Sequence, residues 1–158
     1  MDLLKKIRVK DVMIAPVHTI FEEDDLIHAH EMFIAYGVSY LCVVDHSHRL
    51  GGLISRKYLY KAKSPIKIIE GQNLYDKNII IDGDSYFDKD MLSGYLVRSI
   101  MRRDPFTLGP DEPVATAVIQ MAQQRIGCIP IVNGDKKILG VLTNQDIVNV
   151  TADLLQQK

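Results

Sequence analysis

The chain has 158 residues, of which 47% are hydrophobic and 25% are charged, and its formal net charge at pH 7 is −1. This length suits one domain or two small packed halves. A net charge near zero gives no global field that would attract nucleic acid or an anionic membrane, and no apolar run is long enough to span a bilayer. The N-terminus lacks signal-peptide anatomy. We therefore expect a cytoplasmic protein without nucleic-acid or membrane partners.

The first half of the chain predicts the element order β-α-β-β-α. Helical turns over residues 1–8 and 9–13 end before Pro16, because a proline disfavours helix at the residue before it. A short strand over 17–20 is followed by a helix that opens at the acidic residues 22–25 and ends at Gly37. Apolar runs then predict strands over 40–44 and 50–54, and a last helix over 55–61.

The second half predicts the same order. A helical turn over 96–101 and a strand over 106–108 precede a helix that begins near Pro113 and ends before Gly127. Strands are expected over 128–132 and 138–142, joined by a hairpin turn at Asn133-Gly134, and a helix from 144 to about 155 completes the unit.

Residues 65–95 belong to neither half. Apolar runs predict short strands over 65–70 and 78–81, separated by a turn at Gly71. The stretch 82–90 is interpreted as an acidic surface turn, since it lacks the glycine that a calcium-binding EF-hand loop has at its sixth position. We expect a structured connection that covers a cleft, adds a dimer contact or docks a partner.

The two halves match each other at an offset of 88 residues, as from Gly52 to Gly140 and from Ser55 to Thr143. The offset slips by one at the prolines, where Pro16 corresponds to Pro105. A repeat of this kind predicts two copies of one supersecondary unit that pack together, because one copy does not bury its apolar face alone.

The stretch 138–148 contains the sequence pattern that most directly suggests a ligand-binding site. Thr143 and Asp146 have the spacing of a helix-capping arrangement, which is one interpretation. The other adds a ligand: a helix N-terminus beside Gly140 can hold a phosphate, and a carboxylate can accept hydrogen bonds from two ribose hydroxyls. Both interpretations stay open on this stretch alone.

The ordered series resembles a pair of CBS domains, the Bateman module. Val12-Met13 and Ile100-Met101 each precede a proline, strand, helix, strand, hairpin and strand that ends in Gly-x-x-Ser/Thr. The resemblance assigns residues 8–64 to CBS domain 1 and 96–158 to CBS domain 2, with 65–95 as the connection. It implies an α/β (α+β) fold of tandem β-α-β-β-α repeats about a pseudo-twofold axis, with two clefts between them. It also implies a homodimer and a regulatory, non-catalytic role.

The resemblance further implies an adenosine-containing ligand and a separate effector protein. Asp146 would hold the ribose hydroxyls, Thr143 would contact phosphate or ribose, and Arg125 would reach phosphate. The walls of the adenine slot and the groups around it would come from Ile126, Cys128, Ile129, Pro130, Met101, Phe106 and Thr107. No cofactor is required, and AMP, ADP or ATP would act as the regulatory ligand.

The first copy departs from this pattern. Tyr58 stands where the second copy has Asp146, and Gly37 stands where it has Arg125. A tyrosine cannot accept from two hydroxyls as a carboxylate does, so we expect one competent cleft and one degenerate cleft. Ser55 could still cap a helix or contact a phosphate, and Arg56 and Lys57 could reach phosphates across the pseudo-twofold axis.

Three functions compete. The first is an adenine-nucleotide sensor that acts on a separate protein, and the second binds cyclic di-AMP or S-adenosylmethionine instead. The third is a ligand-free dimerisation scaffold. An enzyme is disfavoured because no nucleophile and base occur together in a known motif, and a metal site is disfavoured because the histidines do not converge. Cys42 and Cys128 are expected to be reduced core residues.

Overall fold

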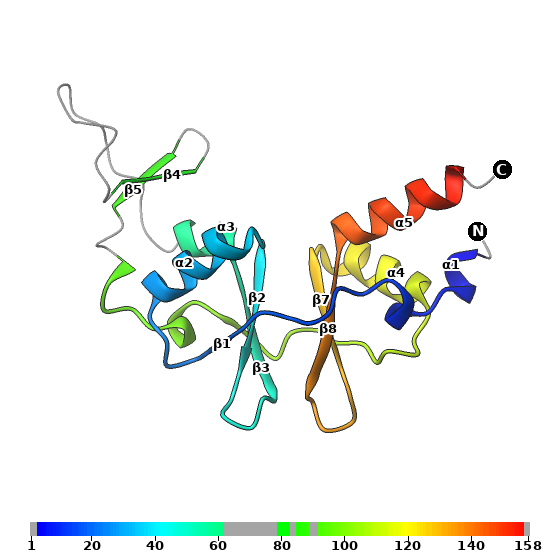
Figure 1. Ribbon diagram of the computed structural model, residues 1–158, viewed down its shortest axis with the longest axis horizontal. Coiled ribbons are helices and arrows are strands. Elements are labelled where there is room, and N and C mark those ends of the chain that lie inside the picture. The colour runs from blue at the N-terminus through cyan, green and yellow to red at the C-terminus, as the bar shows by residue number, and fades with distance from the viewer. Residues whose placement is uncertain (1–2, 62–78, 83–84, 89–91, 157–158) are drawn as a thin grey trace.

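The computed structural model describes residues 3–61, 79–82, 85–88 and 92–156, which form two similar halves lying side by side (Figure 1). One half is built on the hairpin of β2 (Tyr40–Val44) and β3 (Leu50–Ser55). The other is built on the hairpin of β7 (Cys128–Val132) and β8 (Ile138–Thr143). The predicted mixed α/β fold of tandem repeats is confirmed.

The first half adds β1 (Thr19–Phe21), parallel to β2, and the helices α2 (Leu26–Tyr36) and α3 (Arg56–Lys61). Helix α2 begins after Asp25, whose carboxylate accepts a hydrogen bond from the His28 N–H at 2.7 Å. It ends at Gly37 in the left-handed conformation. The buried side chains of α2 lie on one face of the helix, so that face packs on the sheet.

The second half repeats this arrangement with α4 (Val114–Gln124) and α5 (Asn144–Gln156). Its pairing follows the same register, because Leu108 forms a parallel bridge with Ile131 where Ile20 pairs with Val43. The strand predicted over 106–108 is reduced to this one bridge. Both hairpins also have an irregularity at the corresponding place, after Val43 and after Ile131.

The connection between the halves contains a hairpin of β4 (Ile79–Asp82) and β5 (Ser85–Asp88). The strand predicted over 78–81 is confirmed. The prediction of a surface turn over 82–90 was wrong for Ser85–Asp88, where the strand preference of Tyr86 and Phe87 outweighs the acidic composition. The strand predicted over 65–70 lies outside the described residues.

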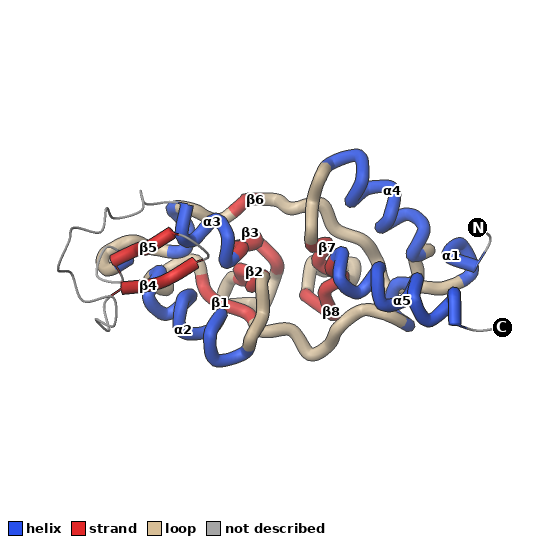
Figure 2. The backbone as a smooth tube through the Cα atoms, turned by 90° about the horizontal axis from the view of Figure 1, so that it is seen from above, coloured by secondary structure: helices blue, strands red, loops and turns tan. Residues whose placement is uncertain are grey.

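Each half is completed by the segment that leads into the other repeat. Helix α1 (Leu3–Lys6) lies beside α4, and Ile14 forms an antiparallel bridge with Val141 of β8. In the reciprocal arrangement, β6 (Arg102–Arg103) pairs with β3. The two lead-in segments cross between the halves on opposite sides of the hairpins (Figure 2). This reciprocal exchange is the pseudo-twofold arrangement that the resemblance to CBS domains implied.

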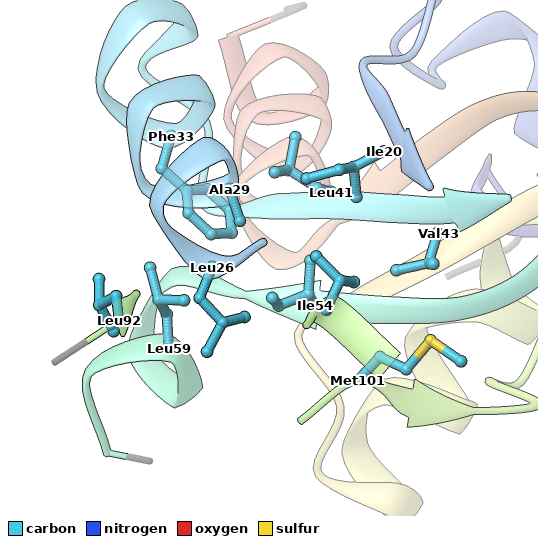
Figure 3. Packing of buried hydrophobic residues seen from close by; sticks show 11 residues of the cluster. Ile20, Leu26, Ala29, Phe33, Leu41, Val43, Ile54, Leu59, Leu92 and Met101 are labelled. Atoms are coloured by element: carbon cyan, nitrogen blue, oxygen red, sulfur yellow. The ribbon is translucent and has the colours of Figure 1, made fainter. Parts of the chain in front are cut away.

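The hydrophobic cores show the same exchange. Val9, from the first lead-in, is fully buried in the core of the second half, with Ile129 and Leu142. Leu92 and Met101, from the second lead-in, are buried in the core of the first half (Figure 3). Because each core needs side chains from the other repeat, the two halves depend on each other for stability.

Two glycines allow the lead-in segments to approach the hairpins. A Cβ added at Gly140 would lie 2.6 Å from Met13 Sδ and 3.0 Å from the Ile14 carbonyl oxygen. A Cβ added at Gly52 would lie 2.7 Å from Met101 Sδ. Each strand therefore has a glycine where the methionine of the other repeat packs against it.

Replacing Gly140 with valine is expected to lower the free energy of unfolding by about 1–3 kcal/mol, since the new side chain overlaps Met13 and nearby backbone. Urea unfolding followed by circular dichroism measures the change. Gly51→Val is the matched control, because the nearest atom to a Cβ there is 3.9 Å away. Equal midpoints for Gly140→Val and the unchanged protein would contradict the packing argument.

Candidate functional site

A cavity of about 860 Å³ opens between the two halves. Its volume falls within the range of roughly 300–1,000 Å³ that is usual for small-molecule sites. The first half contributes residues from β2, β3 and α3, and the second contributes the end of α4 and the start of β7. The lining residues are Ser39, Tyr40, Leu53, Ser55, Arg56, Lys57, Tyr58, Arg102, Pro105, Phe106, Met121, Arg125, Ile126, Gly127, Cys128 and Asn144. We call this cavity the inter-repeat cleft.

The inter-repeat cleft is strongly cationic. Arg56, Lys57, Arg102 and Arg125 all line it, and none of its described lining residues has a carboxylate. In the part of the chain whose side chains are described, no ion pair joins any of these four cations to an acidic residue. Neighbouring Arg103 differs, since its guanidinium lies 3.6 Å from a carboxylate oxygen on Glu22. The four charges are thus available to an anionic ligand.

Arg56 adds a more specific feature. Its Nε atom is buried and has no hydrogen-bond partner among the described residues. A buried donor without an acceptor costs about 1–3 kcal/mol. The atom is closed to solvent, so an anionic group in the inter-repeat cleft could accept this hydrogen bond only if the Arg56 side chain turned toward the cleft.

Arg125 occupies an unfavourable backbone conformation. It follows the last residue of α4 with φ 53° and ψ 42°, and its N–H donates to the Met121 carbonyl. Gly37, its counterpart in the first half, has φ 62° and ψ 26°, where a glycine has no Cβ penalty. An arginine in this conformation carries strain of about 1–2 kcal/mol. Such strain is common where a side chain has a function, and this guanidinium lines the inter-repeat cleft.

Apolar and aromatic groups form the remaining wall, which includes Leu53, Phe106 and Ile126. Tyr40 crosses from the first half to the second, so closely that a Cβ added at Gly127 would collide with its hydroxyl. Burial raises the pKa of Tyr40 above its ordinary value, which keeps the phenol neutral. The cleft therefore combines a cationic part with a surface suited to a planar apolar group.

Thr143 and Asp146 form a helix cap at the start of α5. Oδ2 of Asp146 accepts hydrogen bonds from the Thr143 N–H at 2.7 Å and from the Thr143 hydroxyl at 2.6 Å. The Asp146 N–H donates to the Thr143 hydroxyl at 3.4 Å. Asp146 is 9% exposed as a residue, and its Oδ1 has no hydrogen bond among the described residues. These hydrogen bonds are those of the helix cap that the spacing of Thr143 and Asp146 suggested. Neither residue lines the inter-repeat cleft.

The structure separates the residues that the sequence grouped into one site. The inter-repeat cleft brings together Ser55, Arg56, Phe106, Arg125, Ile126 and Cys128. Met101 and Ile129 lie in the hydrophobic cores, and Pro130 is buried in β7. Thr107 lies at a separate hollow of about 120 Å³. Arg125 therefore shares a cleft with Tyr58 of the first repeat, whereas Asp146 does not line that cleft.

Sequence reasoning missed Tyr40, Arg102 and Asn144 as lining residues. Arg102 directly follows Met101, whose place in the repeat was recognised, so this position could have been noted as a lead-in residue. No signal in the sequence pointed to its pairing with β3 of the other repeat. Tyr40 enters the cleft through a contact between the halves, which a comparison of aligned repeats does not reveal. Asn144 lies at the start of α5, where its N–H donates to the Gly127 carbonyl of the same half at 3.0 Å.

Cys42 and Cys128 are buried and unpaired, as predicted. Burial raises the pKa of Cys42 to about 12 and raises the pKa of Cys128 well above its ordinary value. Both thiols therefore stay protonated at neutral pH and are poor nucleophiles.

Among the described residues, no helix has the length and apolar character needed to cross a membrane. No cluster of three or more histidine, cysteine, aspartate or glutamate residues is placed to hold a metal ion there.

Three known proteins illustrate what this chain is similar to. It is 24% identical over 139 residues to L-aspartate semialdehyde sulfurtransferase of Methanocaldococcus jannaschii, a match that covers 88% of this chain. The chain spans only 22–23% of the length of this relative and of two others that it matches, a homoserine O-acetyltransferase and an inosine-5'-monophosphate dehydrogenase. Those relatives therefore contain large regions outside the part that matches this chain.

Two solved structures share the fold. The CBS domain pair of protein MJ0100, in complex with 5-methylthioadenosine and S-adenosyl-L-methionine, is 21% identical with a TM-score of 0.71, covering 94% of this chain and 98% of the other. CBSX2 of Arabidopsis thaliana, in complex with AMP, is 18% identical with a TM-score of 0.71 and the same coverage. The family model of the CBS domain matches residues 9–64 and 97–153. With most of its residues in these two matches, the chain belongs to the CBS domain family and contains a pair of CBS domains.

Proposed function

We propose that this CBS domain pair binds an adenine nucleotide, AMP, ADP or ATP, in the inter-repeat cleft and passes the bound state to a separate partner protein. The observation that carries the proposal is a cleft whose described residues join four cations, and no carboxylate, to an apolar wall. Arginine forms paired, charge-assisted hydrogen bonds with phosphate, and an apolar wall suits a purine.

The two solved structures support the same ligand class. One is described with AMP and the other with two adenosyl compounds, so this fold accommodates adenosine ligands. The chain's own residues add the preference for phosphate. S-adenosylmethionine has a positively charged sulfonium, which four unpaired cations disfavour. Cyclic di-AMP, which has two phosphates, stays the alternative ligand, and a ligand-free scaffold is the alternative without a ligand.

The proposal assigns the binding role to the residues that share the cleft, namely Ser55, Arg56, Phe106, Arg125, Ile126 and Cys128. A sugar contact by Thr143 and Asp146 would belong to the other cleft of the pseudo-symmetric pair. It would use the free Oδ1 of Asp146, because Oδ2 already accepts two hydrogen bonds. The residue ranges 8–64, 65–95 and 96–158 remain our proposed division of the chain.

The proposal is regulatory and does not assign a reaction to the cleft. It includes a homodimer, which the exposed apolar side chains of Val148 and Leu155 on α5 favour. It also places the protein in the cytoplasm, since two unpaired buried thiols suit a reducing compartment.

A thermal-shift titration with AMP, ADP and ATP tests the proposal. A nucleotide at 100 times its dissociation constant adds about 2.7 kcal/mol of stability, so the melting temperature should rise by several degrees. Arg102→Gln is expected to weaken binding about tenfold or more, because a hydrogen bond to a charged group contributes about 1.5–3 kcal/mol.

Arg103→Gln is the matched control, since Arg103 is the next residue in β6 but lies beside Glu22 and outside the cleft. It should leave the nucleotide-induced shift unchanged. If no adenine nucleotide raises the melting temperature, the sensor proposal fails and the scaffold remains. Equal loss of binding in both arginine variants would show that the nucleotide binds elsewhere.

A further inference from the structure

We infer that the inter-repeat cleft selects ligands with two or more linked phosphate groups and does not select for the ribose hydroxyls. The inference rests on the proposed function and specifies its ligand class. A nucleoside triphosphate should bind more tightly than a diphosphate, and a monophosphate should bind weakly. A ribose and a 2′-deoxyribose nucleotide should bind about equally.

The positive charges that line the cleft are numerous and widely distributed. The cations come from three separate segments: Arg56 and Lys57 from α3, Arg102 from β6 and Arg125 from the end of α4. A single phosphate carries about −1.5 to −2 at pH 7, which leaves part of this charge without a counterpart. A chain of phosphates carries more negative charge and extends over a greater distance, so it can contact cations from several segments.

The buried Nε of Arg56 has no acceptor among the described residues. A phosphate in the cleft could accept its hydrogen bond if the Arg56 side chain turned toward the cleft, and the cost of the unsatisfied donor favours that turn. Arg125 also supports a phosphate ligand, because its strained backbone places a guanidinium at this cleft where the first repeat has Gly37. Both observations concern phosphate-binding groups, and neither involves a sugar.

Among its described lining residues, the cleft has no group suited to a ribose diol. Tyr58 lines the cleft at the position that corresponds to Asp146, and these residues include no carboxylate. A phenol has one donor and cannot accept two hydroxyl hydrogen bonds as a carboxylate can. Asn144 can make single hydrogen bonds to a sugar, but its amide lacks the charge that strengthens a carboxylate contact. Removing one ribose hydroxyl should therefore change the affinity little.

Isothermal titration calorimetry on the full chain tests the inference with AMP, ADP, ATP, 2′-deoxy-ATP and inorganic tripolyphosphate. We expect ATP to bind at least about tenfold more tightly than AMP, a difference of about 1.4 kcal/mol. We expect 2′-deoxy-ATP to bind within about threefold of ATP. The affinity for ATP should also fall as salt rises, and more steeply than the affinity for AMP.

The Tyr58→Asp variant is expected to gain selectivity for a nucleotide that has the ribose 2′-hydroxyl. Tyr58 is 63% exposed, so the substitution should leave the fold intact. The new carboxylate should raise the preference for ATP over 2′-deoxy-ATP by about fivefold or more, a change of about 1 kcal/mol. The new carboxylate should also weaken the binding of tripolyphosphate, because the two negative charges repel each other. Ile34→Asp is the control, since it places a carboxylate at an exposed position outside the cleft, and it should keep both affinities.

The outcomes separate this inference from the proposed function. Equal affinities for AMP and ATP, or a tenfold loss with 2′-deoxy-ATP, would overturn the inference while nucleotide binding stood. Tripolyphosphate binding as tightly as ATP would support the phosphate preference but remove the role of adenine. A lack of binding by every nucleotide and by tripolyphosphate would overturn both.

Discussion

Arg125→Gly is expected to stabilise the ligand-free protein and to remove most of its response to ATP. Arginine at φ 53° carries strain that glycine does not, and Gly37 already occupies the corresponding position. The gain in unfolding free energy should be about 0.5–1 kcal/mol after the greater entropy of unfolded glycine is included. The melting temperature should then rise by about 2 °C. The affinity for ATP should fall about tenfold to a hundredfold, because a charge-assisted hydrogen bond is lost.

Lys136→Gly is the matched control for this result. Lys136 also has a positive φ, 59°, but it lies in the turn between β7 and β8 and does not line the inter-repeat cleft. It should give a similar gain in melting temperature and an unchanged ATP-induced shift. A lower melting temperature for Arg125→Gly, or an unchanged shift, would contradict the interpretation of Arg125 as a strained binding residue.

Phe33→Ala should lower the free energy of unfolding by about 3–5 kcal/mol, the usual cost of removing a fully buried phenylalanine. Phe33 is 0% exposed and packs in the core of the first half (Figure 3). Urea unfolding measures the loss. Ile34→Ala is the control, since Ile34 is the next residue in α2 and is 56% exposed. It should change the unfolding free energy by less than about 0.5 kcal/mol.

The same variant tests whether the halves unfold together. Val9 and Met101 are each buried in the half built by the other repeat, so loss of one core should destabilise both. Hydrogen exchange should therefore show faster exchange in β7 and β8 as well as in β2 and β3 when Phe33 is replaced. If β7 and β8 kept their protection, the two halves would be independent units.

The repeated elements could be predicted because their signals are local. The apolar runs at 40–44 and 128–132 gave strands with the bounds that the structure has. Gly37 and Asn133-Gly134 marked a helix end and a hairpin turn through their backbone preferences. The short strand β6 was not predicted, because Arg102 and Arg103 form a strand only through pairing with β3. Strand β5 was missed because acidic neighbours obscured Tyr86 and Phe87.

Several individual residues of the candidate site were predicted from the sequence, but the set of residues that share one cleft was not. Arg125, Ile126 and Cys128 were selected from the second repeat, and all three line the inter-repeat cleft. They were grouped with Asp146 because both belong to one repeat. In the structure they lie with Ser55 and Arg56 of the other repeat, since the exchanged lead-in segments place the two halves face to face.

The sequence by itself determined that the chain repeats one β-α-β-β-α unit and that its two copies differ at Tyr58 and Asp146. These features follow from side-chain periodicity and backbone preference, which act over a few residues. Only the tertiary structure decided which copy completes each core and which cations share a cleft. Those outcomes depend on contacts between residues far apart in the chain, and a pattern read along one repeat does not encode which copy supplies the partner.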